Sequence, residues 1–69
     1  MHWSNRMDLH VLCVNYDERL IAIVRPSHGG WKFETVQSER SEFIEGFGFR
    51  EPKLAMHFAE NAVKSLGLV

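Results

Sequence analysis

The chain has 69 residues, a formal net charge of −1 and 45% hydrophobic residues, the composition of an ordinary globular protein. A chain this short holds one domain and buries only about 60% of the surface that its unfolded form exposes, so we expect marginal stability. Its one cysteine, Cys13, excludes an internal disulfide, and its nearly neutral charge provides no net basic field for a phosphate backbone.

Residues 1–7 are predicted to form a loose N-terminal arm of a single domain that spans residues 1–69. They contain no apolar run of signal-peptide length, and the longest apolar runs elsewhere are strand-sized. We therefore expect a cytoplasmic protein with no membrane partner.

Two apolar runs follow and predict a β-hairpin, with one strand over residues 9–16, a second over residues 19–25 and a polar break at Asp17 and Glu18. Pro26 is expected to end the second strand because it has no N–H to donate. The first strand is apolar on both faces, with Leu9, Val11 and Cys13 on one face and Leu12, Val14 and Tyr16 on the other.

Residues 31–36 alternate between two faces, with Trp31, Phe33 and Thr35 on one face and Lys32 and Glu34 on the other. This alternation is typical of a half-exposed strand. Residues 42–49 are predicted to form the next strand, in which Phe43, Phe47 and Phe49 share one face and Gly46 marks a bulge or a close approach.

The last third predicts one amphipathic helix over residues 52–66. Pro52 suits its first turn, and Gly67 suits a left-handed C-cap. The apolar residues recur at helical spacing and form one broad stripe: Leu54, Ala55, Phe58, Ala59, Ala62, Val63 and Leu66.

The predicted fold is α+β, with a three- to four-stranded antiparallel meander sheet followed by one C-terminal amphipathic helix packed on one face. A helix of about 22 Å covers one face of such a sheet but not both. Burying a large apolar side chain stabilises by roughly 1.5–3 kcal/mol. We therefore expect the face that carries Leu12, Val14 and Tyr16 to be left uncovered, and a partner protein or a second copy to cover it.

The residue types that often carry catalysis do not combine into a site. His2, His10, His28 and His57 have no metal-ligand spacing, since His10 and Cys13 lie three apart on a strand and point to opposite faces. An apolar strand favours an inert Cys13 thiol. We predict no enzymatic activity, no cofactor and no metal.

A resemblance indicates an alternative. Gly46-Phe47-Gly48 and the alanine-rich helix after it resemble the end of a double-stranded-RNA-binding domain, which has three strands, a Gly-x-Gly and such a helix. The match covers the last third of the chain, and Arg50-Glu51-Pro52-Lys53 stand where that family has its basic cluster. The resemblance implies a nucleic-acid-binding module, with contacts from Arg40, Arg50 and Lys53.

Aromatic and arginine side chains dominate the energetics of protein interfaces. The candidate partner-binding residues are therefore Trp3, Tyr16, Arg25, His28, Trp31 and Arg40. Our leading hypothesis is a small non-enzymatic protein-binding module that acts through the uncovered sheet face or a sheet edge and forms a homodimer. Such a module suits an adaptor, an antitoxin-like partner, or a phage or mobile-element inhibitor of a host protein complex.

Overall fold

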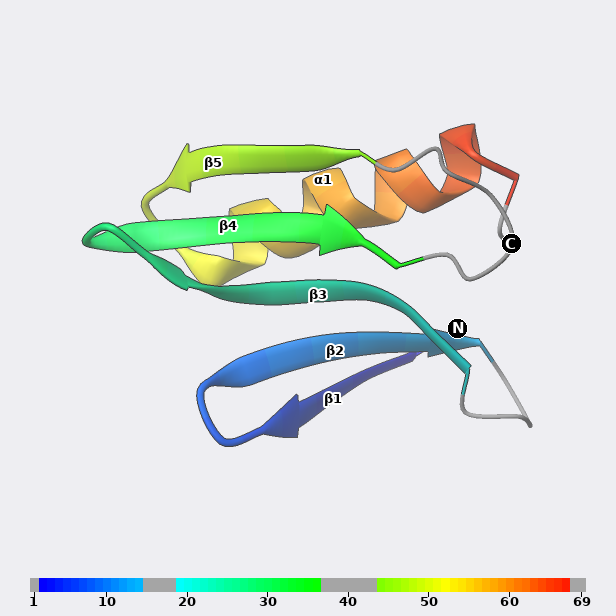
Figure 1. Ribbon diagram of the computed structural model, residues 1–69, viewed down its shortest axis with the longest axis horizontal. Coiled ribbons are helices and arrows are strands. Elements are labelled where there is room, and N and C mark those ends of the chain that lie inside the picture. The colour runs from blue at the N-terminus through cyan, green and yellow to red at the C-terminus, as the bar shows by residue number, and fades with distance from the viewer. Residues whose placement is uncertain (1, 15–18, 37–43, 68–69) are drawn as a thin grey trace.

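A computed structural model describes residues 2–14, 19–36 and 44–67. Its strands form a five-stranded antiparallel sheet in the order β1-β2-β3-β4-β5, and one C-terminal helix packs on a single face of the sheet (Figure 1). The elements are β1 (His2–Arg6), β2 (Leu9–Val14), β3 (Arg19–Ser27), β4 (Gly30–Thr35), β5 (Glu45–Phe49) and α1 (Pro52–Ser65). The α+β meander and its single covering helix are therefore as predicted.

The sheet has one strand more than expected, because residues expected to form a loose arm form β1. This strand pairs with β2 along its whole length, from His2 opposite Cys13 to Arg6 opposite Leu9. Trp3 packs against the core, and its indole Nε1 donates a hydrogen bond to Glu60 Oε1 on α1 at 2.7 Å. Its contacts with both β2 and the helix hold the first strand in place.

The assignment of the two faces of β2 was wrong. Leu12 is fully buried and belongs to the core cluster under α1, whereas Val11 and Cys13 point to the opposite face. Tyr16, which the same prediction placed beside Leu12, lies outside the described residues. Because both faces of β2 are apolar, alternation alone could not tell which of them the helix covers.

A β-bulge where β3 pairs with β2 adds Ile21 to the core. Leu12 pairs with Ala22 and Cys13 pairs with Leu20, so Ile21 is the extra residue on β3. A bulge of this kind changes the direction of the side chains around it. Ile21 is only 1% exposed and packs with Leu12 in the core cluster.

Pro26 does not end β3, contrary to expectation. The strand continues to Ser27, and Pro26 pairs with Trp31 of β4. The pairing of β3 with β2 begins only at Val24, so the missing N–H of Pro26 interrupts no ladder on that side. His28 and Gly29 then form a two-residue turn in which both have positive φ, 49° and 79°.

The alternation predicted for β4 is confirmed, because Phe33 and Thr35 are buried on the helix side while Lys32 and Glu34 are partly exposed on the other. The Thr35 hydroxyl accepts a hydrogen bond from the Ile44 backbone N–H at 2.9 Å. Gly46 lies opposite Phe33, and a Cβ there would come within 2.5 Å of Phe33 Cε1. The close approach expected at Gly46 is therefore present.

Phe47 and Phe49 lie on opposite faces, which corrects the prediction that they share one. The register of β4 with β5 shifts between Trp31 and Phe33, and Gly48 in the extra stretch has φ 80°. The Phe49 ring packs against the Phe33 and Phe58 rings at centroid distances of 5.8 and 5.2 Å. Phe47 is 59% exposed and points away from the helix side.

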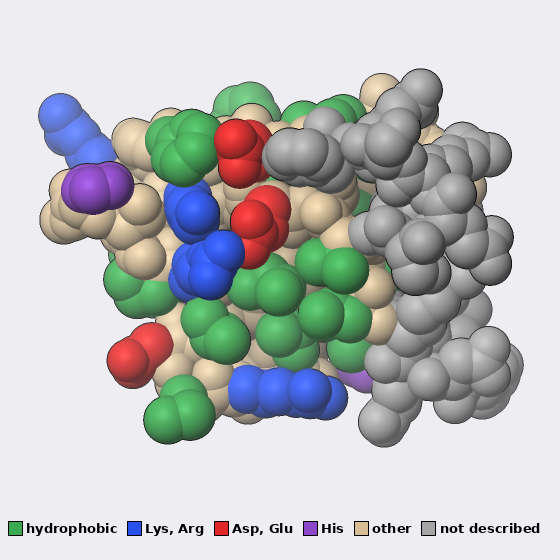
Figure 2. All heavy atoms as spheres, in the orientation of Figure 1, with side chains coloured by type: hydrophobic (Ala, Val, Ile, Leu, Met, Phe, Trp, Pro, Cys, Tyr) green, Lys and Arg blue, Asp and Glu red, His purple; other side chains and the backbone are tan. Residues whose placement is uncertain are grey.

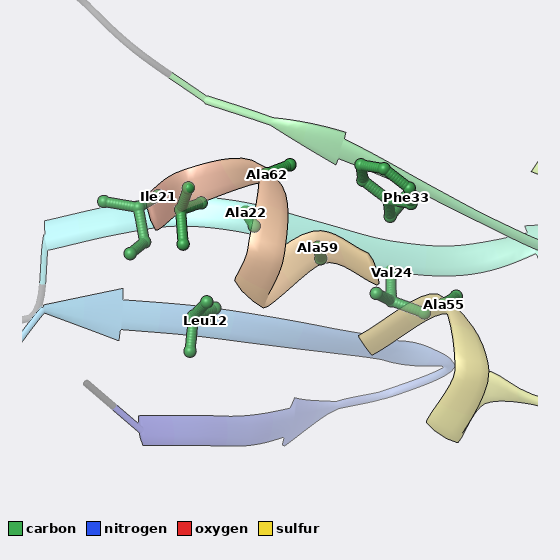
Figure 3. Packing of buried hydrophobic residues seen from close by; sticks show 9 residues of the cluster. Leu12, Ile21, Ala22, Val24, Phe33, Ala55, Ala59 and Ala62 are labelled. Atoms are coloured by element: carbon green, nitrogen blue, oxygen red, sulfur yellow. The ribbon is translucent and has the colours of Figure 1, made fainter. Parts of the chain in front are cut away.

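Helix α1 begins at Pro52, and Gly67 after its end has φ 72°, as predicted. It lies over β3, β4 and β5 (Figure 1). Of the predicted apolar stripe, the small residues and one valine are buried, whereas Leu54 and Phe58 stay about half exposed. Figure 3 shows the core between helix and sheet, built from Leu12, Ile21, Ala22, Val24, Phe33, Ala55, Ala59, Ala62 and Val63.

Candidate protein-binding surface

The face of the sheet turned away from α1 has no covering layer among the described elements. We call this surface the open face; the strand pairings assign to it His2, Ser4, Arg6, Leu9, Val11, Cys13, Leu20, Ile23, Arg25, Ser27, Lys32, Glu34, Glu45 and Phe47.

Register aligns these side chains in rows that cross the strands. One row runs through all five strands, because each of its residues is paired with the next: Ser4, Val11, Ile23, Glu34 and Glu45. The row beside it holds the pair Arg6 and Leu9 and the pair Arg25 and Lys32. The rows place apolar side chains over β2 and β3 and charged side chains over β3, β4 and β5.

The apolar part of the open face is partly exposed to solvent. Val11 and Cys13 are already buried, at 3% and 2% exposed, while Leu9, Leu20 and Ile23 are only partly buried. Figure 2 shows hydrophobic side chains gathered in the middle of this face, bordered by charged side chains of both signs. This mixture of apolar centre and charged border is the usual anatomy of a protein interface.

The charged part consists of a basic pair beside an acidic pair. Arg25 lies directly opposite Lys32, and Glu34 lies directly opposite Glu45. Arg25 forms a salt bridge with Glu34 diagonally across the strands. Like charges directly opposite each other on a sheet are destabilising, so this chain keeps two unfavourable pairs side by side.

Lys32 and Phe47 extend the charged part toward β5. The Lys32 Nζ lies 5.4 Å from the centroid of the Phe47 ring, which is a cation–π distance. Phe47 is the most exposed aromatic side chain among the described residues. An exposed ring beside a cation is a typical anchor for a protein partner.

The structure does not bring the predicted partner-binding residues together. Arg25 lies on the open face, but Trp3 and Trp31 lie on the helix side and pack against the core. The Trp31 ring is also 5.6 Å from the His10 ring. His28 is exposed at the β3–β4 turn, and Tyr16 and Arg40 lie outside the described residues.

The cations of the nucleic-acid alternative are also separated from the open face. Arg50 and Lys53 are exposed at the connection between β5 and α1, and Arg40 lies outside the described residues. Arg50 and His28 line a hollow of about 400 Å³ together with Phe47 and Phe49. This hollow has no acidic side chain or thiol among the described residues that line it.

Sequence reasoning missed the apolar residues that form the open face. Leu9, Leu20 and Ile23 belong to two apolar runs whose alternation carries no sign of which side is covered. Phe47 was missed because the bulge at Gly48 reverses its direction. The one sequence signal for the open face was the alternation of residues 31–36, which already separated Lys32 and Glu34 from the core.

Three further findings concern ligand clusters, the thiol and helix length in the described residues. In the ranges 2–14, 19–36 and 44–67, no three His, Cys, Asp or Glu side chains lie close enough to hold a metal ion. Cys13 is a buried free thiol. The described part of the chain also has no helix with the length and apolarity needed to cross a bilayer.

No protein-family model, no curated protein and no solved structure matches this chain. The properties of the open face are therefore the basis for a functional proposal.

Proposed function

We propose that this protein is a small non-enzymatic protein-binding module whose binding surface is the open face. The observation that carries the proposal is the position of Leu9, Leu20 and Ile23, which are partly exposed on a sheet face without a covering helix or strand in the described chain. Apolar surface that is removed from water contributes roughly 25 cal/mol per Å², so covering the part of these side chains that is still exposed favours binding of another protein.

The size of the domain strengthens this argument. Among the described residues of this 69-residue chain, the core cluster lies between the sheet and α1, and on the other side of the sheet Leu9, Leu20 and Ile23 stay partly exposed. Domains of this size bury a smaller fraction of their surface than larger domains do, and they often gain stability from an additional element, such as a partner chain. A protein that covers the open face would supply the missing second layer.

The charges favour a protein over a nucleic acid as the partner. Arg25 is paired with Glu34, and Glu45 lies in the same row as Glu34. A phosphate backbone placed on this face would meet two carboxylates as well as the cations, and the whole chain has a net charge of −1. A protein surface with both signs of charge is compatible with this pattern.

Three roles suit a module of this size: an adaptor, an antitoxin-like partner, or a phage or mobile-element inhibitor of a host protein complex. All three need one stable protein–protein interface and no catalytic centre. The proposal is therefore made for protein binding, and the identity of the bound protein is the object of the experiment.

The test is affinity capture from an extract of the organism that encodes the chain, with three tagged versions. The wild type is compared with Ile23→Arg, which places a charge on the open face, and with Leu54→Arg. Leu54 is 47% exposed on α1, so its replacement is the matched control. We expect a stoichiometric protein with the wild type and with Leu54→Arg, and its loss with Ile23→Arg.

Equal capture by all three versions would contradict the assignment of the open face. Capture of nucleic acid instead of protein would contradict the proposed partner class. Phosphate contacts are recognised by binding that weakens steeply as salt is added.

A further inference from the structure

We propose that the protein covering the open face is a second copy of this chain, related to the first by a two-fold axis that runs across the strands. This inference rests on the proposed function and names the partner of the same surface. It follows from the order of the charges on the face, from the symmetry of that order and from the size of the face.

The charge order on the open face is unfavourable within one copy. Arg25 and Lys32 stand opposite each other on β3 and β4, and Glu34 and Glu45 stand opposite each other on β4 and β5. Such pairs are destabilising in an isolated sheet. The Arg25–Glu34 salt bridge relieves part of this, but Lys32 and Glu45 have no salt-bridge partner among the described residues. Both would gain from an opposite charge supplied from outside.

A second copy supplies the opposite charge for Lys32. A two-fold axis parallel to the rows, placed between the basic row and the acidic row, exchanges the two rows in the opposing molecule. The basic row of each copy then lies over the acidic row of the other, so Lys32 of one copy faces Glu34 of its partner, twice. Two-fold interfaces are self-complementary in this way, with residue i contacting j and j contacting i.

The same rotation also covers the apolar side chains of β2 and β3. An axis that runs across the strands keeps each strand over its own copy, so β2 and β3 of one molecule face β2 and β3 of the other. Leu9 of each copy would then lie over Val11 of the other, and Ile23 would lie over the aliphatic part of the other copy's Arg25, so both are buried between two sheets. Sheets packed face to face in this manner lie about 10 Å apart and form a sandwich core.

The open face is large enough for a stable dimer. The molecule measures 31 × 23 × 17 Å, and the open face lies across the two longer dimensions (Figure 1). Covering most of such a face on two copies buries more than the roughly 1,000 Å² that a specific interface requires.

The charges on the open face also argue against a partner with a strongly acidic or strongly basic surface. Such a partner would require charges of one sign, whereas this face carries three cations and two carboxylates: Arg6, Arg25, Lys32, Glu34 and Glu45.

The experiment is a charge exchange between two variants, Lys32→Glu and Glu34→Lys, measured by sedimentation equilibrium over a range of concentrations. In a dimer of Lys32→Glu alone, two carboxylates face each other twice, and in a dimer of Glu34→Lys alone, two ammonium groups do. We expect the wild type to be a dimer at micromolar concentration and each variant to dissociate about tenfold more readily or worse.

Mixing the two variants in equal amounts provides the decisive measurement. In the mixed dimer both contacts again join opposite charges, so we expect a heterodimer that is tighter than either homodimer, identified by native mass spectrometry. A change in the fold of one chain cannot produce this rescue. Lys53→Glu, a charge reversal at an exposed position on α1, is the control and should dimerise like the wild type.

A wild-type chain that stays monomeric throughout, or a mixture that fails to form the heterodimer, would overturn the inference. If such a monomer still captures another protein and Ile23→Arg abolishes that capture, the proposed function stands and only the second copy is rejected. If neither self-association nor capture depends on Ile23, both are rejected.

Discussion

The two faces of this sheet are made by the same strands but differ in side-chain size and polarity. The covered face has aliphatic and aromatic side chains, and α1 lies against it through Ala55, Ala59 and Ala62. The open face combines partly exposed aliphatic side chains with five charged ones. The comparison teaches that one sequence can specify a closed packing surface and a surface left for another molecule on opposite sides of a single layer.

The difference follows from what each face must do. Alanine lets a helix approach a sheet closely, and the resulting core excludes water around fully buried residues such as Leu12 and Val24. A binding face has to remain soluble before its partner arrives, and interspersed charges serve this purpose. The open face therefore resembles an interface rather than an unfinished core.

The largest expected effect comes from truncating the same residue type on each face of β2. Leu12→Ala removes a fully buried side chain under α1, so it should lower the free energy of unfolding by about 2–5 kcal/mol. Leu9→Ala acts on a partly exposed side chain of the open face and should cost about 1 kcal/mol or less. Urea unfolding followed by circular dichroism, at a concentration where the chain is monomeric, measures both.

Equal losses for Leu12→Ala and Leu9→Ala would mean that the open face is packed as tightly as the covered one. At concentrations where the proposed dimer forms, the cost of Leu9→Ala should grow, because the partner copy then adds to its burial.

A smaller effect is expected where the covered face allows no extra atom. Gly46→Ala places a Cβ within 2.5 Å of Phe33 Cε1, in a ring that is only 5% exposed. Overpacking of this kind should cost about 1–3 kcal/mol. The loss should shrink when Phe33→Leu is also present, and a double-mutant cycle in thermal unfolding measures that coupling. Glu45→Ala, next in sequence but on the open face, is the control and should stay within about 0.5 kcal/mol of wild type.

The smallest effect concerns the salt bridge of the open face. Arg25→Gln removes the partner of Glu34, and the two side chains are 42% and 24% exposed. An ion pair this accessible contributes less than about 1 kcal/mol to the stability of the monomer, and added salt should reduce its contribution further. Unfolding of both proteins at low and high salt checks this. A large loss that is insensitive to salt would indicate that Arg25 supports the fold rather than the binding surface.

The local elements of the fold could be predicted from the sequence because their signals are local. Pro52, the spaced alanines and Gly67 define α1, and the alternation from Trp31 to Thr35 defines β4. The first strand was missed because His2–Arg6 has no apolar alternation of its own; β1 depends on pairing with β2 and on the bond from Trp3 to Glu60.

The candidate surface could be predicted only in outline. That one helix leaves one face uncovered follows from its size, but the identity of that face depends on the register of β2, which is apolar on both sides. Two bulges then each reverse the direction of one side chain, so that Ile21 points into the core and Phe47 points out of it. Trp3 and Trp31 were expected to meet a partner because large aromatics dominate interfaces, but here they fill the edges of the core.

The order of the strands has a consequence for how the chain folds. Each strand pairs with its neighbours in sequence, so the whole sheet can form by adding one hairpin after another. Loop closure between such neighbours costs little entropy, and proteins rich in local contacts fold quickly. The contact from Trp3 to Glu60 joins residues 57 positions apart, so it can form only once the helix docks. In a Trp31→Phe variant, the fluorescence of Trp3 should therefore report the docking of α1 on the sheet.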